Sequence, residues 1–295
     1  YILVLAAAIN ASIASVLAFG KKYIVPYLAI NLLVLLPEAG QMSYVTLQTF
    51  LLCTSISAFV VYWKADKRWL KNGMLLIAGF MAGLSLFVIM PGGLLTLVCY
   101  AIIVLVINRE KVQQGFVDLG IGLLGVVICL AYMHFCVCRL DKVVDAMQFT
   151  ATYFTKTGYK YDPVSFAIAI GLFLRDCLFI FVFYTGAYYL SKNTTGRIGW
   201  LGGALYLFLV FVYIYYQKKP VISPAMFFSS LIVLPALFER KMFGEGWKYV
   251  LSNDVLVRFF LFVFPLIASI GTNTALSGRI TCFLIAWAFL WYDRK

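Results

Sequence analysis

Two adjacent charged residues interrupt one of the longest apolar stretches of the sequence. Arg175 and Asp176 lie inside "VSFAIAIGLFLRDCLFIFVFYTGAYYL", which holds no other charge. Ionisable side chains at membrane depth are costly and usually face a polar interior or a charged partner. We therefore predict that this pair binds substrate, for example a lipid phosphate. The alternatives are a mutual or interhelical ion pair, or an apolar span that starts only after Asp176.

Glu38 is the candidate catalytic residue. It lies in "LLPEAGQMSY", a short segment between apolar runs that contains no other charge. A lone carboxylate in such a position can act as a general base or as a metal ligand. The alternative is a carboxylate that is simply solvated in a loop.

Two further loops offer groups for binding phosphate or sugar. Residues 268–279, "ASIGTNTALSGR", are rich in small polar residues and end in an arginine. Backbone amides and an arginine fork bind phosphate well. The second loop is the dibasic turn Lys218-Lys219-Pro220, which can contact a lipid-linked phosphate. The alternatives are a plain connecting turn at 268–279 and an interfacial anchor at the dibasic turn. The substrate-binding residues predicted from these two loops are Thr272, Asn273, Arg279, Lys218 and Lys219.

One short motif contains soft metal ligands. His134, Cys136 and Cys138 form an H-x-C-x-C pattern, but this spacing matches no established metal site. We interpret it as a packed helix end. The sequence also contains no Walker motif, nucleophile elbow or zinc signature, so no metal-ligating residue is predicted.

The composition restricts where these residues can lie. The chain has 295 residues, of which 63% are hydrophobic and 12% charged, and its mean hydropathy is +0.95. A soluble domain of this size could not bury so much apolar surface. The formal net charge of +12 does not indicate a nucleic-acid partner, because the lysines and arginines fall in short loops between apolar runs, where they set orientation and meet anionic lipid headgroups.

The apolar runs predict an all-α, polytopic transmembrane bundle of about 9–11 membrane segments, which forms a single domain over residues 1–295. The loop at 138–163 is predicted to be an amphipathic segment that lies on the outer surface. The predicted segments are 2–19, 23–36, 44–63, 73–90, 92–107, 119–137, 164–190, 198–216, 221–238, 255–270 and 280–292.

A predicted hairpin fixes the orientation of these segments. Gly73–Ile107 is uncharged and too long for one crossing of a bilayer core about 30 Å thick. We predict that Met90-Pro91-Gly92-Gly93 forms the turn that divides it. The flanking loops are basic, so the turn is assigned to the outer side and the C-terminus to the cytoplasm. Tyr1 then lies outside, and at least one earlier span is expected.

Several stretches resemble the GT-C superfamily of integral-membrane glycosyltransferases, which use polyprenyl-phosphate sugars. The order of segments is similar to that in the bacterial branch of the family: the "PE" loop, then "SYVTLQTFLLCTSISAFVVYW", then a basic loop and the hairpin. "FPLIASIGTNTALSG" is similar to a C-terminal stretch of some members. The predicted topology also agrees with the family, whose members act at the outer face of the membrane. The resemblance spans most of the chain through loose, mostly apolar motifs.

The sequence departs from the family pattern at two places. Members usually carry a catalytic aspartate in the first outer loop, and this loop is missing from the predicted topology, as in an N-terminally truncated chain. Members also often have an acidic residue after a "T-L-R-T"-like stretch. Here the text is "T-L-Q-T-F", with Phe50 at that position. Glu38 is the nearby carboxylate that could substitute.

The resemblance implies transfer of a sugar from a polyprenyl-phosphate carrier to a cell-envelope glycan or lipid at the outer face of the bacterial inner membrane. Arg175, Arg279 and the outer lysines would neutralise the carrier phosphate. The reaction would be assisted by a carboxylate or by a divalent metal ion, and the sequence does not decide whether a metal cofactor is used. The expected partners are membrane lipids and the lipid-linked sugar, with no nucleic acid. A transporter or flippase of lipid-linked saccharide, coupled through Arg175-Asp176, is the alternative, and a non-catalytic membrane scaffold is a third.

Overall fold

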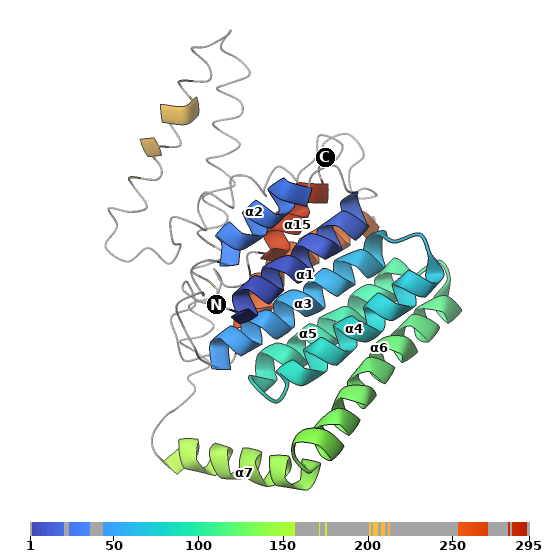
Figure 1. Ribbon diagram of the computed structural model, residues 1–295, viewed down its shortest axis with the longest axis vertical. Helices are drawn as coiled ribbons and strands as arrows, with labels where there is room; N and C mark the ends of the chain where they lie inside the picture. Colours follow the sequence, from blue (N-terminus) through green and yellow to red (C-terminus); the bar gives the residue numbers. More distant parts are fainter. Residues whose placement is uncertain are drawn as a thin grey trace.

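The computed structural model describes residues 2–20, 24–35, 44–156, 253–270, 283 and 285–293, with single positions between 171 and 212. These residues form helices and their connections without any strand, which confirms the all-α prediction (Figure 1). The helices are α1 (Ile2–Phe19), α2 (Ile24–Leu35), α3 (Tyr44–Lys64), α4 (Arg68–Ser85), α5 (Met90–Ile107), α6 (Val112–Tyr132), the π-helical turn η3 (Met133–Val137), α7 (Leu140–Lys156), α13 (Asn253–Ser269) and α15 (Ile285–Asp293).

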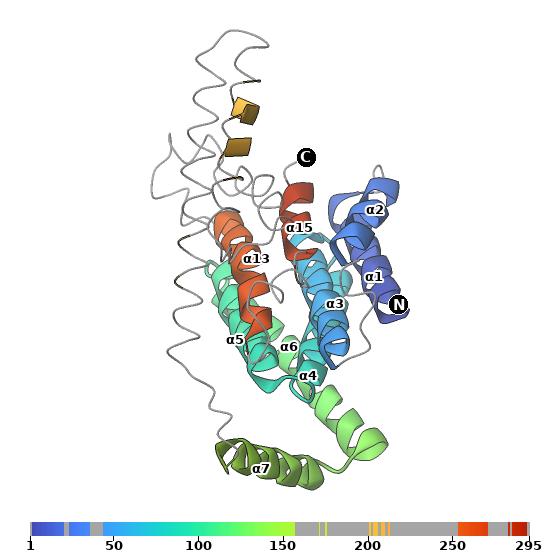
Figure 2. The same ribbon diagram turned by 90° about the vertical axis from the view of Figure 1, so that its left-hand side faces the viewer.

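Helix α3 lies at the centre of the described bundle. It packs against α1 on one side and α4 on the other, while α5 packs against both α4 and α13. Figures 1 and 2 show α1, α3, α4 and α5 running alongside one another, with the orange α13 beside α5 and the red α15 near α1 and α3. The short connections between α3, α4, α5 and α6 make these consecutive helices antiparallel.

An aromatic cluster joins the central helices. The ring of Phe59 on α3 stacks on Tyr100 of α5, with 4.4 Å between the ring centroids, and Phe260 of α13 meets both rings edge-on. Trp287 of α15 stacks on Phe262 and donates an indole hydrogen bond of 2.9 Å to the Phe262 carbonyl. Because aromatic rings bury large apolar areas, this cluster fixes α13 and α15, which are distant in sequence, against the first half of the chain.

Four of the described helices are long and apolar enough to cross a membrane: Ile2–Phe19, Val45–Lys64, Met90–Ile107 and Val112–Val137. In the apolar 18-residue stretch of each helix, 89% of the residues of Val45–Lys64 are buried within the bundle, against only 17% of those of Val112–Val137. An apolar helix that exposes most of its surface needs an apolar solvent around it. The four helices therefore indicate a multi-pass membrane protein.

The hairpin between α4 and α5 differs from the prediction in the place of its turn. The chain reverses at Leu86–Ile89, and α5 already begins at Met90, with Pro91 in its first turn. Proline is well suited there because the first amides of a helix have no intrahelical acceptor. The proline starts the returning helix and does not form the bend.

Gly92 and Gly93 also have a different role from the predicted one, because both are buried inside α5. A Cβ on Gly93 would overlap the Ser85 hydroxyl at the end of α4. A Cβ on Gly92 would come within 2.9 Å of the Ala268 carbonyl oxygen in α13. The two glycines therefore allow close helix–helix contact and are not needed for a backbone reversal.

Glycines also form the interface between α4 and α6. A Cβ on Gly79 would overlap the backbone carbonyl of Gly122, and a Cβ on Gly125 would overlap the backbone of Leu76 and Phe80. Gly79 and Gly83 are spaced as in the small-xxx-small pattern, which brings helix backbones together in membranes. Helix α6 is thereby held against α4, with much of its remaining surface exposed.

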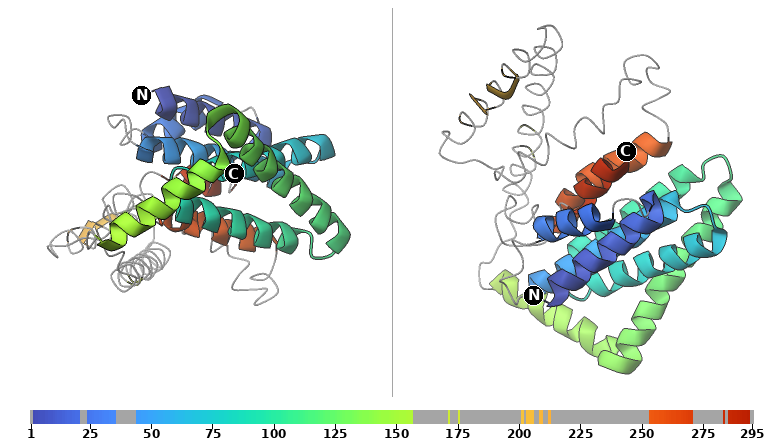
Figure 3. Two further views of the ribbon diagram at one scale, coloured as in Figure 1. Left: turned by 90° about the horizontal axis from the view of Figure 1, so that it is seen from below. Right: turned by 45° about the horizontal axis from the view of Figure 1, so that its top comes forward.

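The predicted amphipathic segment contains a helix, α7, inside the range 138–163. Its exposed Lys142 and Asp145 form a pair at 3.5 Å, while Phe149 on the same helix leaves 73% of its surface exposed. Figures 2 and 3 show α6 and α7 meeting at an angle, with α7 running across the lower edge of the molecule. The amphipathic helix is present, and its position on a membrane surface stays a prediction.

Candidate functional site

The described bundle has two ends of different chemistry. One end holds the starts of α3 and α5 and the ends of α4 and α13; we call it the Gln48 end. The other holds the ends of α3 and α5 and the starts of α4, α6 and α13; we call it the Asp118 end.

Gln48 is the main polar residue of the first end. Its side chain is 1% exposed, and neither its amide nitrogen nor its amide oxygen has a hydrogen-bond partner among the described residues. The hydroxyl of neighbouring Thr49 is also buried and also has no hydrogen-bond partner among the described residues. Buried polar groups are nearly always paired, so two adjacent exceptions mark this place for a hydrogen-bonding ligand.

Three helices meet beside Gln48. Gly92 of α5 lies close to both Gln48 and the end of α13. A Cβ added to Gly92 would be 3.3 Å from the Gln48 amide nitrogen and 3.2 Å from the carbonyl oxygen of Ile270, the residue after α13. Ile270 belongs to residues 268–279, the stretch predicted to bind phosphate or sugar, of which 271–279 lie outside the described residues. The described first residues of this stretch therefore lie near Gly92, as the Gln48 amide does.

Neighbouring hydroxyls at this end are already satisfied. Ser85 donates to the Ala82 carbonyl at 2.7 Å, and Thr96 donates to the Gly92 carbonyl at 2.8 Å. Gln48 and Thr49 thus differ from their neighbours in still having hydrogen-bonding capacity. A neutral amide offers donors and an acceptor but no charge, so this pair can bind a hydroxyl or a carbonyl and cannot supply acid–base chemistry.

The residues predicted from the sequence fall mostly outside the described part of the chain. Arg175 is described as helical and exposed. The others, namely Glu38, Asp176, Lys218, Lys219, Thr272, Asn273 and Arg279, lie outside the described residues. The proposed roles of all eight stay predictions.

A buried carboxylate dominates the Asp118 end. Asp118 is 2% exposed, and one of its oxygens accepts hydrogen bonds from Tyr62 at 2.8 Å and Asn108 at 3.3 Å. Its other oxygen accepts from Gln114 at 2.8 Å and forms an ion pair with Arg68. The four partners come from α3, α4, α6 and the residue that follows α5, so one carboxylate connects four helices.

A second ion-pair cluster lies at the same end. Asp293 at the end of α15 contacts Lys64 at 2.6 Å and Arg258 at 2.7 Å, and its side chain is 7% exposed. Arg258 was expected inside a predicted membrane segment, and Asp293 is its anionic partner there. Trp63 donates to Asp254 at 3.2 Å and lies under the Lys64 ammonium. These contacts hold α13 and α15 to α3.

The H-x-C-x-C motif lies in the π-helical turn η3 and the residue after it. His134 Nδ1 accepts a hydrogen bond from the Leu140 amide at 3.3 Å, while Cys136 and Cys138 are exposed. Phe135 between them is 82% exposed. The motif therefore lies at a helix end, as predicted, but the prediction that this end is packed is wrong. Within the described ranges no three metal-ligating side chains come together.

Sequence reasoning missed both buried polar centres. Asp118 was passed over because the predicted apolar segment began one residue later, at 119. Its spacing of four from Gln114 places both on one helix face and was a usable signal. Gln48 appeared only inside the quoted "T-L-Q-T-F" stretch, where Phe50 was the departure noted. No sequence feature signals that it is unpaired.

Comparisons with known proteins give no identification: no protein-family model, curated protein or solved structure matches the chain.

Proposed function

We propose that the chain is the membrane portion of a glycosyltransferase that transfers a sugar from a polyprenyl-phosphate carrier to a cell-envelope glycan or lipid. The observation that carries the proposal is the unpaired, buried Gln48 amide at the junction of α3, α5 and α13. It belongs to the "T-L-Q-T" stretch, and a Cβ on Gly92 would approach both its amide and the carbonyl of Ile270, a residue of "FPLIASIGTNTALSG". These are two of the stretches that resemble the GT-C superfamily.

The charge distribution supports an outward orientation of the Gln48 end. The opposite end carries basic residues in two short connections. Lys67 and Arg68 lie between α3 and α4 and at the start of α4, and Arg109 and Lys111 lie between α5 and α6. Short basic loops mark the cytoplasmic side. The Gln48 end would then face outward, where lipid-linked donors are used by the family that the sequence resembles.

The proposed roles follow from the chemistry of each group. Gln48 would donate to, or accept from, a sugar hydroxyl. Arg279, Arg175, Lys218 and Lys219 would neutralise the carrier phosphate. The acceptor hydroxyl would form a bond to the anomeric carbon as the bond from that carbon to the phosphate oxygen breaks. The hydroxyl proton would go to Glu38, the candidate base, and the carrier would leave as a phosphate.

The test is a donor-consumption assay on the chain reconstituted in liposomes that contain polyprenyl-phosphate sugars and an envelope-glycan acceptor. Release of polyprenyl phosphate with gain of sugar on the acceptor is expected. Gln48→Leu should lower the rate by about 10–100-fold, since a hydrogen bond in a buried site is worth about 1–3 kcal/mol. The same change should raise thermal stability, because it removes an unpaired buried amide.

Gln113→Leu, at an exposed position of α6, is the matched control and should retain activity. Full activity in Gln48→Leu would show that Gln48 does not contact the substrate, and the proposal would lose its main support. Movement of the intact lipid-linked saccharide across the bilayer without release of polyprenyl phosphate would identify a flippase instead.

A further inference from the structure

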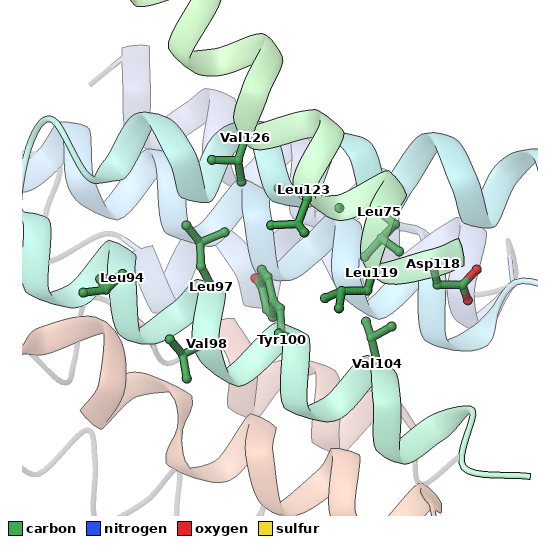
Figure 4. Close-up of a pocket in the computed structure, with 13 residues that line it drawn as sticks. Leu75, Leu94, Leu97, Val98, Tyr100, Val104, Asp118, Leu119, Leu123 and Val126 are labelled. Atoms are coloured by element: carbon green, nitrogen blue, oxygen red, sulfur yellow. The ribbon is translucent and has the colours of Figure 1, made fainter. Parts of the chain in front are cut away.

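A groove runs along the outside of the bundle between α5 and α6. It has a volume of about 300 Å³, and Leu94 and Val126 line one end while Val104 and Asp118 line the other (Figure 4). Pockets for small molecules have volumes of about 300–1,000 Å³. Apart from Asp118 the lining side chains are almost entirely apolar, with Tyr100 at the middle.

The groove exists because α6 is held by α4. The glycine contacts of Gly79 with Gly122, and of Gly125 with Leu76, bring these two backbones together. Helix α5 is packed instead on α13 through the Phe59–Tyr100–Phe260 cluster. The facing side chains of α5 and α6 therefore stay apart over several turns, and a gap too large for a side chain to fill remains.

The groove opens onto a strongly apolar surface. Leu94, Val98 and Leu123 on its two edges are 47%, 46% and 55% exposed, and both helices are among the four that could cross a membrane. An apolar gap that stays empty loses the dispersion contacts of all the atoms that line it. In a bilayer the molecules available to fill it are hydrocarbon chains.

The end of the groove at Asp118 has an excess of basic side chains at the surface: Lys67, Arg68, Arg109 and Lys111 are exposed there, against Asp66 and Glu110. The carboxylate of Asp118 points away from the groove (Figure 4) and is neutralised by Arg68 and three neutral donors. Arg68 still exposes 42% of its side chain. Lys67 and Lys111, which precede α4 and α6, are exposed and make no capping hydrogen bond from their side chains.

This arrangement combines a hydrocarbon groove with cations at one end. Positive side chains at helix starts are unfavourable, because the helix dipole is also positive there. A phosphate beside Lys67, Arg68 and Lys111 would remove that penalty, and its acyl chain would extend along the groove toward Leu94. Exposed Trp69 lies next to the same charges, as expected of an aromatic side chain at headgroup depth.

We propose that one acyl chain of an anionic glycerophospholipid occupies the groove between α5 and α6, with its phosphate bound by Arg68, Lys67 and Lys111. The charge distribution assigns this lipid to the cytoplasmic leaflet, the end opposite Gln48. The site is therefore separate from the donor site of the proposed function and does not depend on it.

Native mass spectrometry of the whole chain, released from detergent in the presence of phosphatidylglycerol or phosphatidylcholine with identical acyl chains, tests the proposal. Phosphatidylglycerol should be retained more strongly. Val98→Trp fills the groove and should abolish the retained lipid. Ile102→Trp, on the same helix and 54% exposed but outside the groove, should leave it unchanged.

Charge is tested separately. Lys67→Gln combined with Lys111→Gln should weaken phosphatidylglycerol binding by about fivefold for each lysine and leave phosphatidylcholine binding unaffected. Lys142→Gln on α7 is the control and should have no effect. Equal retention of the two lipids, or retention that survives Val98→Trp, overturns the proposal. Displacement of phosphatidylglycerol by an equal concentration of a polyprenyl phosphate would overturn the assigned occupant and make the groove part of the donor site.

Discussion

Asp118 has almost no contact with solvent, yet each of its carboxylate oxygens accepts hydrogen bonds from two side chains. A buried charge is tolerated when it is paired and fully hydrogen-bonded. Arg68 is different, because 42% of its side chain is exposed and it can reach water without its partner. The two members of the pair should therefore respond unequally to substitution.

Arg68→Gln should destabilise the protein more than Asp118→Asn does. The first change leaves a buried carboxylate without its counter-charge, which costs about 3–5 kcal/mol. The second leaves an arginine that can turn to solvent and mainly disturbs neutral hydrogen bonds, at about 1–3 kcal/mol. Thermal unfolding of the purified variants in detergent measures both. The double variant Arg68→Gln/Asp118→Asn should recover part of the loss, and equal losses in the two single variants would contradict this account.

The two buried polar residues also show what sequence reasoning can find at this scale. A charge such as Asp118 is visible in the sequence, but its burial depends on residues from three other helical regions that only folding brings together. Gln48 is noticeable only because its amide has no partner, which is a property of the packed structure. The residues chosen from the sequence instead were charged or in glycine-rich loops, and seven of these eight lie outside the described residues.

Helices are the scale at which the sequence was most informative. Apolar runs predicted α1, α2, α3 and α13 to within two residues of their observed bounds. Helix α4 was predicted to start at 73 and starts at Arg68, because its first turn is basic and a hydropathy criterion excludes such residues. Apolar runs therefore locate the buried part of a helix more accurately than its polar ends.

Packing between helices was less predictable than the helices themselves. Gly92 and Gly93 were interpreted as turn residues, as their position after a proline favoured, and they are packing residues in α5. Whether a glycine provides a turn or a contact depends on which backbone approaches it. That information is present in the structure and absent from the local sequence.

The glycines of α6 provide a direct test of this packing. Gly125→Ala would place a methyl group against the Leu76 and Phe80 backbone of α4, and overpacking of this kind costs about 1–3 kcal/mol. Gly120→Ala, five residues earlier in the same helix, meets no atom within 4 Å. It should be neutral or stabilising by about 0.5–1 kcal/mol, because alanine favours helix. Thermal unfolding of the two variants, compared with the unmodified chain, decides between these outcomes.

A similar loss in both variants would mean that α6 is sensitive to any substitution at glycine and that its contact with α4 is not the reason. A loss in neither would mean that the two backbones can separate at little cost. In that case the groove between α5 and α6, which depends on α6 being held by α4, would also change shape.

At the scale of the whole molecule, the two ends of the bundle differ in charge, and a different function is proposed for each. The connections at the Asp118 end contain three basic residues, Lys67, Arg109 and Lys111, and two acidic ones, Asp66 and Glu110, whereas the turn between α4 and α5 at the Gln48 end is uncharged. Both proposals depend on this difference. The glycosyltransferase site requires the Gln48 end to face outward, and the leaflet assigned to the phospholipid site follows from the Asp118 end facing the cytoplasm.

Accessibility of introduced cysteines to an impermeant thiol reagent in intact cells measures this orientation. The background must lack the native cysteines, because Cys136 and Cys138 are exposed. Cysteines at Arg139 and Lys142, near the junction of α6 and α7, should react from outside, and cysteines at Lys67 and Lys111 should react only after the membrane is permeabilised. All four positions are exposed, so a failure to react reports the membrane barrier and not burial. Gly93 is unsuitable as a labelling position because its Cβ would overlap Ser85.

The labelling result bears on the two proposals in different ways. The opposite pattern, with Lys67 and Lys111 reactive from outside, would place Gln48 at the cytoplasmic face and remove the outward donor site. The groove would keep its shape and its cations but would take its lipid from the other leaflet. Reaction of all four positions from one side would mean that α4, α5 and α6 do not cross the membrane in alternation. The groove would then have no hydrocarbon around it, and both proposals would fail together.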